Sequence, residues 1–469
     1  MVKLTIDDKA VEAAEGTTIL KAAESVGIGI PHFCYHPRLS IAGNCRMCLV
    51  EVAGAKNLVI SCKETVREGM VVRTGSEIVK RARADVLEFI LINHPLDCPI
   101  CDQSGECKLQ DYYFDYSLSP SRLKDKKVLK PKAQPIGPNV ILDAERCVEC
   151  TRCIRFCEEI AGAHEIGLFE RGDHSTIGAL KNGQLKNPYS LCTVDLCPVG
   201  ALTSVDFRFK KRVWYLKNTP SICTGCATAC NIFIDHESSI VYRFRPREND
   251  DINRSWLCDE GRLGYKKLLG ENRVLNPYIL KDSKLQSSTW EEALNFIKET
   301  TKSNAAKDVA CLLSAQSSIE ENRAIAGLCT KSFAASKLYW TGLPSDPSFG
   351  DKILRNSDRN PNSNGVQTIS KVKFDQLQSG SGLIVLDIPA SDDIAKITEA
   401  KTSWVILISS HMPENRGWFD VLLPKAAYAE QEGTFVNCDG KSQKTSAAFA
   451  PIAESRTAMD IAAMIEKEL

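Results

Sequence analysis

The sequence predicts a multidomain chain that is α+β and rich in loops over its first half and α/β over its second. Three observations support this prediction. Of the 20 cysteines in 469 residues, 17 lie in the first 258 residues and three in the last 211. Short segments of alternating apolar residues open the chain, which is typical of strands. Beyond residue 272, short apolar strands alternate with helical segments, which favours a mainly parallel sheet.

The charge balance argues against a protein that binds a polyanion. Lys and Arg number 59, as do Asp and Glu, whereas nucleic-acid-binding proteins usually carry a basic surplus. The first residues enter a strand pattern without an apolar signal core or a transit segment, so we expect a cytoplasmic location. In that compartment, many cysteines indicate metal or redox chemistry rather than disulfides. The longest apolar stretches, 382–390 and 404–409, are too short to span a bilayer.

Residues 1–78 are predicted to form a small β-rich domain. Apolar residues alternate over 2–6, and Thr17 or Thr18 can cap a short helix that ends at Gly27. Further strands are predicted at residues 47–52, 58–62 and 70–73. The first cysteine group lies in this part with the spacing C-x10-C-x2-C-x13-C, and its members are Cys34, Cys45, Cys48 and Cys62.

The spacing of the first group fits a [2Fe–2S] cluster. Gly43 and Asn44 precede the central pair, where a tight loop must present backbone N–H groups to the cluster sulfurs. Such clusters take thiolate ligands, and these hydrogen bonds tune their potentials. The alternative is a zinc ribbon, but the wide first and last gaps fit poorly with paired C-x2-C knuckles. In its β-rich frame, the group resembles a [2Fe–2S] ferredoxin domain of the β-grasp fold.

Residues 79–120 contain the second group, with the spacing H-x3-C-x2-C-x5-C. A helix is predicted from Ser76 to about Asn93, with apolar residues from Ile78 to Ile90 at helical spacing, and it delivers the histidine. The members of the group are His94, Cys98, Cys101 and Cys107. Taken alone, they fit a Cys₃His zinc site and a [4Fe–4S] cluster equally well. The position directly after a [2Fe–2S] domain favours the cluster, whose potential a neutral imidazole should raise.

Residues 121–206 contain the third group, a C-x2-C-x2-C-x3-C run followed much later by a Cys-Pro pair. In bacterial ferredoxins the fourth cysteine of such a run ligates another cluster, and a distant Cys-Pro completes the first. The predicted [4Fe–4S] ligands are therefore Cys147, Cys150, Cys153 and Cys197. Cys157 and Cys192 are left over, and we expect them to be buried, inert thiols. The basic runs 124–132 and 208–217 are predicted to be solvated faces.

Residues 207–272 contain the fourth group, with the spacing C-x2-C-x3-C-x27-C. Its members are Cys223, Cys226, Cys230 and Cys258. The group suits another [4Fe–4S] cluster, and a Cys₄ zinc site is the competing interpretation. Residues 273–469 are predicted to form an α/β domain with a helix over 290–301. Its buried strands are predicted at residues 308–314, 383–387 and 404–409.

Four cysteine groups in this order resemble the large iron–sulfur subunit, the G subunit, of bacterial NADH-quinone oxidoreductase (respiratory complex I). The resemblance is strong over residues 1–272 and weak beyond them. It implies a [2Fe–2S] cluster on the first group and a [4Fe–4S] cluster on each of the others, with His94 as a ligand. In that family the first three clusters form part of the wire between flavin and quinone. The fourth, which only some members keep, lies off that route, so a mainly structural role is expected.

The rest of the chain resembles a shortened molybdopterin-oxidoreductase domain. Residues 428–441 are similar to a segment of that superfamily, although the customary Arg after an Asp-Gly pair is Lys441 here. No motif stands out that would ligate molybdenum, while Cys311 and Cys329 are not excluded by their spacing. The resemblance implies a scaffold that has lost its cofactor site, so no molybdenum is expected.

The resemblance implies electron transfer within an NADH:quinone oxidoreductase, an ion-translocating enzyme, by a subunit without catalytic residues of its own. Electrons would enter from an NADH-oxidising flavoprotein partner and leave towards quinone through other peripheral-arm subunits. No G-x-G-x-x-G loop follows a strand, so NADH should bind elsewhere. The subunit would lie peripherally at the cytoplasmic side of the inner (plasma) membrane. It would touch the membrane only through the complex and bind no nucleic acid.

Two alternative functions fit the same residues. An iron–sulfur subunit of an NAD-linked hydrogenase or formate dehydrogenase would share the first three groups. Iron hydrogenases need further cysteine motifs in the C-terminal half, where only Cys311, Cys329 and Cys438 remain. Formate dehydrogenases need a full molybdenum domain. The second alternative is a zinc-scaffold interaction protein with no redox role.

Overall fold

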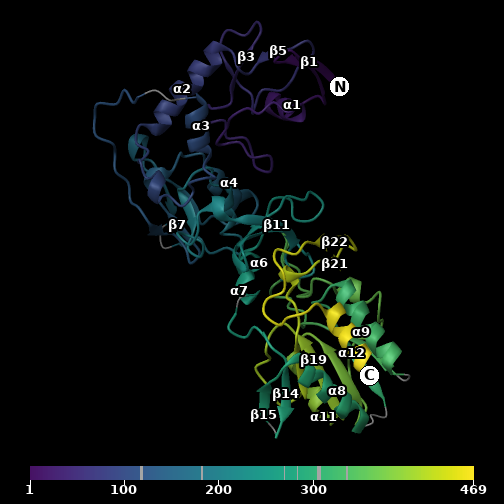
Figure 1. Ribbon diagram of the computed structural model, residues 1–469. Helices are drawn as coiled ribbons and strands as arrows, with labels where there is room; N and C mark the ends of the chain where they lie inside the picture. The colour runs from purple at the N-terminus through teal and green to yellow at the C-terminus, as the bar shows by residue number, and fades with distance from the viewer. Residues whose placement is uncertain (117–119, 181–182, 269, 283, 304–307, 334–335) are drawn as a thin grey trace. The chain divides into compact units, whose positions relative to one another are not determined.

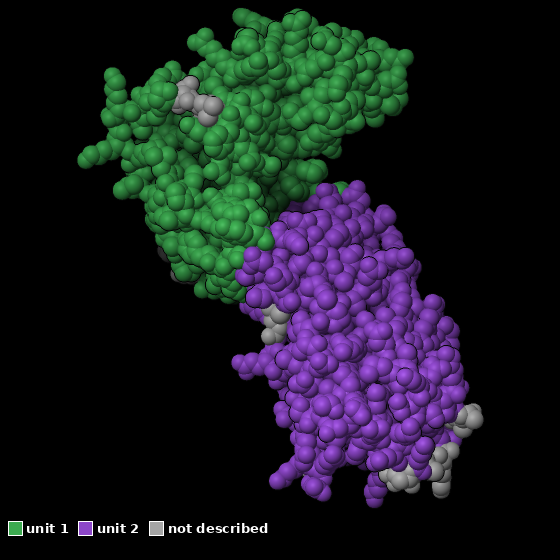
Figure 2. Space-filling model, viewed as in Figure 1, with its two compact units in different colours: residues 1–215 green, residues 216–469 purple. Residues whose placement is uncertain are grey.

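The chain forms two compact units, Met1–Tyr215 and Leu216–Leu469, which Figure 2 shows in different colours. The computed structural model describes residues 1–116, 120–180, 183–268, 270–282, 284–303, 308–333 and 336–469. Within these residues, no helix is both long and apolar enough to cross a membrane. The five segments predicted from the sequence are finer than the two units and remain predictions.

A five-stranded sheet opens the first unit, in the order β2-β1-β5-β3-β4. Its strands are β1 (Val2–Ile6), β2 (Lys9–Ala13), β3 (Leu49–Val52), β4 (Val59–Ile60) and β5 (Val71–Arg73) (Figure 1). Strands β1 and β5 are parallel, and the other neighbours are antiparallel. Helix α1 (Ile19–Ser25) begins after Thr18, whose Oγ1 accepts a hydrogen bond from Lys21 N at 3.4 Å. The predicted strands and the capped helix are confirmed.

One apolar core joins α1 to this sheet. Leu4 and Ile6 point to the same face of β1 because alternate strand residues share a face, and both pack with Leu20 of α1. Cys48 and Cys62 belong to the same core. The β-rich frame therefore holds two members of the first cysteine group in fixed positions.

Two helices follow the sheet: α2 (Glu77–Leu91) and α3 (Lys108–Tyr116), with the 3₁₀ turn η1 (Cys98–Ile100) between them. The buried positions of α2 are Val79, Arg83 and Leu87, spaced one helical turn apart. The predicted helix is confirmed. Some of its apolar residues lie outside the buried stripe: Ile78 is 59% exposed and Phe89 is 76% exposed.

The remainder of the first unit consists of short elements joined by loops. Its strands are β6 (Gln134–Pro135), β7 (Val140–Leu142), β8 (Ile166–Phe169), β9 (Thr176–Ala179) and β10 (Leu202–Ser204). Its helices and turns are η2 (Ala144–Arg146), α4 (Arg152–Glu159), η3 (Gly172–His174), α5 (Cys192–Leu196) and η4 (Val213–Tyr215). The sheet β10-β7-β6 and the hairpin β8-β9 are antiparallel. The predicted loop-rich character of this part is confirmed.

The basic runs are not simply solvated faces, so that prediction is wrong at their central residues. The Lys127 ammonium donates hydrogen bonds to the carbonyl oxygens of Leu91, Ile92 and His94 at 2.8–2.9 Å. The Arg212 guanidinium donates to the carbonyl oxygen of Cys101 at 2.6 Å. Both cations therefore hold segments that lie far away in the sequence.

The second unit begins with an antiparallel sheet of three strands, β11 (Lys217–Ile222), β12 (Asn231–Glu237) and β13 (Ile240–Pro246). The short helices α6 (Asp259–Leu263) and α7 (Tyr265–Leu268) follow it. A hairpin from near the end of the chain, β21 (Gly433–Val436) and β22 (Ser442–Thr445), lies against β11. Two segments far apart in the sequence thus surround the fourth cysteine group.

A seven-stranded sheet forms the centre of the second unit, in the order β15-β14-β20-β19-β18-β16-β17. The strands are β14 (Tyr278–Lys281), β15 (Lys284–Ser287), β16 (Val309–Ser314), β17 (Ser336–Thr341), β18 (Gly382–Leu386), β19 (Trp404–Ser409) and β20 (Val421–Pro424). The five strands from β20 to β17 are parallel to one another. Strand β14 pairs antiparallel with β20, and β15 pairs antiparallel with β14. The predicted, mainly parallel α/β sheet is confirmed.

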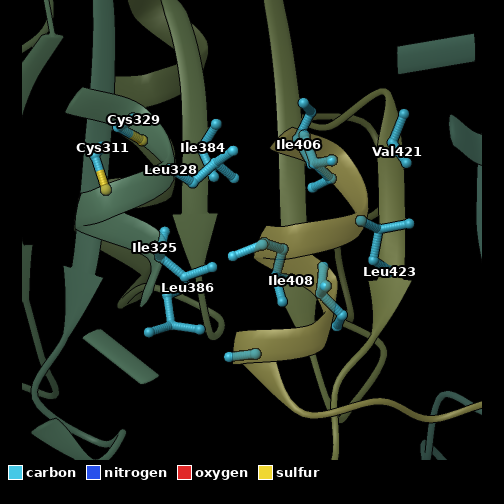
Figure 3. Packing of buried hydrophobic residues seen from close by; sticks show 14 of the residues in the cluster. Cys311, Ile325, Leu328, Cys329, Ile384, Leu386, Ile406, Ile408, Val421 and Leu423 are labelled. Atoms are coloured by element: carbon cyan, nitrogen blue, oxygen red, sulfur yellow. The ribbon is translucent and has the colours of Figure 1, made fainter. Parts of the chain in front are cut away.

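Helices cover both faces of this sheet. They are α8 (Trp290–Ser303), α9 (Ile319–Ser332), α10 (Ser363–Val366), α11 (Ser391–Glu399) and α12 (Ala458–Glu468). Residues from α8, α9 and α12 pack on one face, and Ile397 of α11 packs on the other. Figure 3 shows the first of these cores, with Ile384, Ile406 and Ile408 pointing to the same side of neighbouring strands. Because helices cover both faces of the sheet, every side chain of a central strand is buried, so these strands are continuous apolar runs.

Candidate iron–sulfur ligand sets

The thiols of the first group lie within hydrogen-bond distance of one another. The backbone N–H groups of Phe33 and Cys34 each donate to Cys45 Sγ at 3.4 Å. Hydrogen bonds from the Cys45 and Cys62 thiols lower the pKa of Cys34. A hydrogen bond from Cys62 lowers the pKa of Cys48 to about 7. The four predicted ligands therefore converge in one place, three of them buried.

The histidine of the second group lines a pocket together with Cys98 and Cys107. Burial lowers the pKa of His94 to about 4, assisted by the charges of Lys127 and Arg146. The imidazole is therefore neutral at pH 7, which is the form that ligates metals. Its Nδ1 atom is buried without a hydrogen-bond partner among the described residues. A buried polar atom of this kind is expected to have a partner, so His94 fits the role of a ligand.

The cysteine loop of the second group is only partly buried: Cys98 is exposed, Cys101 is buried and Cys107 is partly buried. Burial raises the pKa of Cys107 to about 11, and the neighbouring thiols of Cys101 and Cys98 raise it further. Gly200 lies directly over Cys101, and a Cβ atom at that position would overlap the Cys101 sulfur. The Arg212 guanidinium holds the loop from outside through the carbonyl oxygens of Cys101 and Pro99.

The third group surrounds one enclosed cavity. All four of its cysteines line this cavity together with apolar side chains such as Leu142 and Ile177. Burial raises the pKa of Cys150 to about 11, and burial also raises that of Cys153 well above its ordinary value. The Glu149 N–H donates to Cys147 Sγ at 3.4 Å. A pocket of buried thiols with an inward N–H group fits a cluster that is ligated by thiolates.

Residues of the first, second and third groups meet at one buried apolar cluster in the first unit. Cys34 of the first group and Cys150 of the third belong to this cluster, and the partly buried Cys45, Cys107 and Cys197 pack against it. The apolar side chains between them include Phe33, Met47, Leu109 and Val199. The Asn44 amide also donates to the Glu149 carbonyl oxygen at 3.1 Å, which ties the first ligand loop to the third.

The fourth group lies between β11, β12 and α6 in the second unit. The N–H of Gly225 donates to Cys223 Sγ at 3.4 Å, and the N–H of Gly261 donates to Cys258 Sγ at 3.3 Å. A Cβ atom on Gly261 would lie 2.8 Å from Cys223 Sγ. Burial raises the pKa of Cys258 to about 12. Glycine is therefore required where the backbone comes close to these thiols.

Residues other than glycine adopt left-handed backbone conformations in three of the four ligand loops. Arg46, Glu149, Thr151 and Ala229 all have positive φ angles between 51° and 58°. Such conformations are uncommon for residues with a side chain and concentrate at functional sites. Here they turn the chain tightly between successive cysteines.

Within the described residues, no group of three or more His, Cys, Asp or Glu side chains is arranged to hold a single metal ion. Five cations that hold the ligand loops were not predicted from the sequence: Lys127, Arg152, Arg155, Arg212 and Arg359. The signal available for Arg152 and Arg155 is their position between and directly after the cysteines of the third run. No such signal exists for Lys127 or Arg212, which are distant in sequence from the loops they contact.

The cysteines outside the four groups lie in different surroundings. Cys157 and Cys192 are both fully buried, and burial raises the pKa of Cys157 to about 12. Cys311 of β16 and Cys329 of α9 are also fully buried, within the apolar core shown in Figure 3. Cys438 is exposed. The predicted burial of Cys157 and Cys192 is confirmed.

A cleft of about 250 Å³ in the second unit lies at the carboxyl ends of the parallel strands. Cys223 and Tyr428 line one side of it, and Asp387 and Lys425 line the other. The Lys425 ammonium lies 2.7 Å from a Glu321 carboxylate oxygen and 2.8 Å from an Asp387 carboxylate oxygen. Burial alone would raise the pKa of Asp387, but Lys425 holds it below the ordinary value. A buried network of charges thus occupies the floor of the cleft.

Five family models match the chain in succession. The first two are the 2Fe-2S iron-sulfur cluster binding domain at residues 1–77 and the NADH-ubiquinone oxidoreductase-G iron-sulfur binding region at 83–122. The ferredoxin-like domain of NADH-quinone oxidoreductase subunit 3 follows at 137–203, and the NADH-ubiquinone oxidoreductase NDSU1/NuoG-like 4Fe-4S domain at 216–266. The last is Molybdopterin oxidoreductase at 356–468. This order confirms the predicted fold class.

Curated relatives share about two thirds of the chain. The G subunit of NADH-quinone oxidoreductase from Rickettsia bellii is 44% identical over 321 residues, which are 68% of this chain and 47% of the relative. The NADH-ubiquinone oxidoreductase 75 kDa subunit of Reclinomonas americana is 45% identical over 298 residues, which are 63% and 43% of the two chains. A chain of a crystal structure of an NAD⁺-reducing [NiFe]-hydrogenase is 29% identical, with a TM-score of 0.41, and the match covers 45% of this chain and 91% of that one.

The chain spans about half the length of the curated relatives it matches. The match with the Rickettsia bellii relative nevertheless covers most of the chain at 44% identity, and the family models follow the same domain order. The chain is therefore a relative of the NADH-quinone oxidoreductase G subunit, with a 2Fe-2S domain, 4Fe-4S domains and a molybdopterin-oxidoreductase-like domain in that order.

Proposed function

We propose that the four residue groups ligate one [2Fe–2S] and three [4Fe–4S] clusters. Cys34, Cys45, Cys48 and Cys62 are the proposed ligands of the [2Fe–2S] cluster. The proposed [4Fe–4S] ligands are His94, Cys98, Cys101 and Cys107, then Cys147, Cys150, Cys153 and Cys197, and then Cys223, Cys226, Cys230 and Cys258. The convergence of the thiols, the unpartnered His94 Nδ1 and the close glycines support this assignment. When bound, these clusters supply one-electron carriers.

The function that follows is electron transfer from an NADH-oxidising flavoprotein subunit towards quinone, within a complex of the NADH-quinone oxidoreductase type. The buried cluster that joins residues of the first three ligand sets carries this proposal, since carriers that are close together can exchange electrons. The subunit would lie in the peripheral arm at the cytoplasmic side of the membrane. Partner subunits would supply the NADH site and the quinone site.

The chain's own residues tune the carriers through hydrogen bonds and charge. Backbone N–H groups donate to Cys45, Cys147, Cys223 and Cys258, which belong to three of the four ligand sets. Donors to a ligand sulfur withdraw electron density and raise the reduction potential. Most of the proposed ligand cysteines are buried, which lowers the local dielectric and strengthens these effects.

The molybdopterin-oxidoreductase-like domain is proposed to be a scaffold without molybdenum. Its cleft, at about 250 Å³, is smaller than the cavities that hold drug-sized ligands. The charge network of Lys425 lies on its floor. Cys311 and Cys329, the cysteines that spacing left open as ligands, are enclosed in the apolar core instead. These residues do not fit a pterin cofactor with its metal.

Metal and sulfide counts on anaerobically purified chain test the assignment. We expect about 14 irons and about as many acid-labile sulfides per chain, because one [2Fe–2S] and three [4Fe–4S] clusters are present. Zinc and molybdenum should be below stoichiometric amounts. A preparation dominated by zinc would contradict the electron-transfer function and support the zinc-scaffold alternative. Stoichiometric molybdenum or tungsten would contradict the scaffold and favour a formate dehydrogenase subunit.

His94→Cys is expected to keep a [4Fe–4S] cluster and to lower its reduction potential. A thiolate adds negative charge where the native chain has a neutral imidazole, so reduction becomes less favourable. Low-temperature EPR during graded reduction measures the change. His164→Cys, at an exposed histidine of the same unit, is the matched control and should leave every signal in place. An unchanged set of signals in His94→Cys would count against His94 as a ligand.

A further inference from the structure

Two arginines of α4, the buried Arg155 and the partly buried Arg152, lie between the first and third ligand sets. The Arg155 Nη2 atom donates to the carbonyl oxygen of Cys34 at 2.6 Å and to that of Cys150 at 3.1 Å. These two cysteines belong to different ligand sets and are more than a hundred residues apart in the sequence. A single guanidinium therefore contacts the backbone of both sets.

Arg152 makes a second connection of the same kind. Its guanidinium donates to the carbonyl oxygen of Tyr35, next to Cys34, and to that of Leu196, next to Cys197, the latter at 3.4 Å. Arg152 thus lies close to ligands of both sets.

Neither guanidinium has a carboxylate partner among the residues that the structure describes. Every hydrogen bond from Arg155 goes to a carbonyl oxygen or to the Thr151 hydroxyl, and Arg152 donates only to carbonyl oxygens. Arg155 is 9% exposed, and Arg152 Nε is buried without a partner. Buried charges in proteins are normally paired with an opposite charge. One buried and one partly buried guanidinium at the backbone of both cysteine sets therefore point to anionic centres at those sets.

We propose that Arg155, supported by Arg152, is a cationic bridge between the [2Fe–2S] and the third-group [4Fe–4S] cluster, which fixes their spacing and raises both reduction potentials. This inference rests on the proposed function, because it requires both clusters. Reduction adds one negative charge to a cluster, and a nearby cation in a low-dielectric interior stabilises that charge. Both arginines are positioning residues, since they act on the carriers through the ligand loops and through their charge.

The bridge also relates the two potentials to each other. Because Arg155 contacts both sets, its removal should shift both clusters in the same direction. The His94 cluster should not shift, since no hydrogen bond from either arginine reaches the second ligand set within the described residues. Arginine suits this position because its planar fork presents several donors at once, whereas lysine is a point charge.

Redox titration followed by low-temperature EPR on the full chain, loaded anaerobically with iron and sulfide, tests the bridge. In Arg155→Met we expect full iron and sulfide content, with the one-electron reduction equilibrium of both clusters at least tenfold less favourable. Tenfold corresponds to about 59 mV. Arg155→Lys keeps the charge and should recover most of the shift. Arg171→Met removes an exposed arginine of the same unit and should change neither potential.

The outcomes separate the inference from the function beneath it. Absence of iron and sulfide from the native chain would overturn the cluster assignment. Full iron content in Arg155→Met with both potentials unchanged would overturn the bridge and leave the assignment intact. If Arg155→Met fails to fold or to bind iron and sulfide, the iron content and the reduction potentials of both clusters are measured in Arg152→Met instead. Lower reduction potentials of both clusters in Arg152→Met would support the bridge. Unchanged potentials at full iron content would contradict it.

Discussion

Cys197→Ala is expected to remove one complete [4Fe–4S] cluster, so that the iron content falls from about 14 to about ten per chain. Cys197 is the proposed ligand that comes from outside the run containing the other three, and it lines the same enclosed cavity. Three thiolates hold a cubane incompletely. Under the proposed function, NADH-dependent quinone reduction by the assembled complex should fall to background, because Cys150 of this set shares a buried cluster with Cys34, and Cys107 packs against it.

Iron and sulfide analysis together with EPR measures the loss. Cys192→Ala is the matched control, since Cys192 is a fully buried cysteine at the start of α5, the helix that leads to Cys197. It should retain all of the iron. Retention of all clusters in Cys197→Ala, or an equal loss of iron in Cys192→Ala, would contradict the proposed ligand set.

Lys425→Met is expected to destabilise the second unit by about 3–5 kcal/mol, because it leaves two buried carboxylates without their cation. In the native chain the Lys425 ammonium contacts Glu321, Asp387 and the Ser317 hydroxyl at 2.7–2.8 Å. Lys425 itself is 5% exposed, so solvent cannot replace it. Urea unfolding of the second unit, followed at constant salt, measures the change in free energy.

The pH dependence of this effect has a definite sign. The pKa of Asp387 is lowered in the folded chain, so its favourable contribution is present above the unfolded carboxyl pKa and is lost as the pH falls through the folded value. In Lys425→Met the buried carboxyls instead bind protons more readily. The difference in the free energy of unfolding between the native chain and Lys425→Met should therefore shrink as the pH falls. Lys371→Met, at an exposed lysine of the same unit, should change stability by less than about 0.5 kcal/mol. A similarly small effect of Lys425→Met at neutral pH would contradict this account.

Local patterns in the sequence were sufficient for much of the fold. Alternation over Val2–Ile6 predicted β1, and Thr18 before an apolar stripe predicted α1. The continuous apolar segment at Trp404–Ser409 predicted β19, because a strand covered on both faces needs no polar positions. Cysteine spacing predicted which thiols would converge, since each group is largely contained in one or two short loops. The use of these thiols as ligands remains a prediction.

The rest depended on contacts between distant segments. Lys127 and Arg212 lie in runs of basic residues that have the composition of a solvated surface, yet the fold places them against ligand loops. Apolar spacing predicted α2, but such spacing does not say how much of a wide apolar stripe the neighbouring elements cover. Ile78 and Phe89 are exposed for that reason. The charge network of Lys425 likewise joins residues of three elements that no local pattern connects.

The close approach of Gly200 to Cys101 couples the lengths of two loops. Cys197 belongs to the third ligand set. Three residues later, Gly200 leaves room for the sulfur of Cys101, which belongs to the second ligand set. The Lys108 N–H also donates to the carbonyl oxygen of Pro198 at 3.0 Å, directly after Cys107. An insertion or deletion within residues 197–200 would therefore displace proposed ligands of two metal centres in one event. Changes of loop length are better tolerated elsewhere, as in the hairpin turn between β8 and β9, which contains none of these ligands.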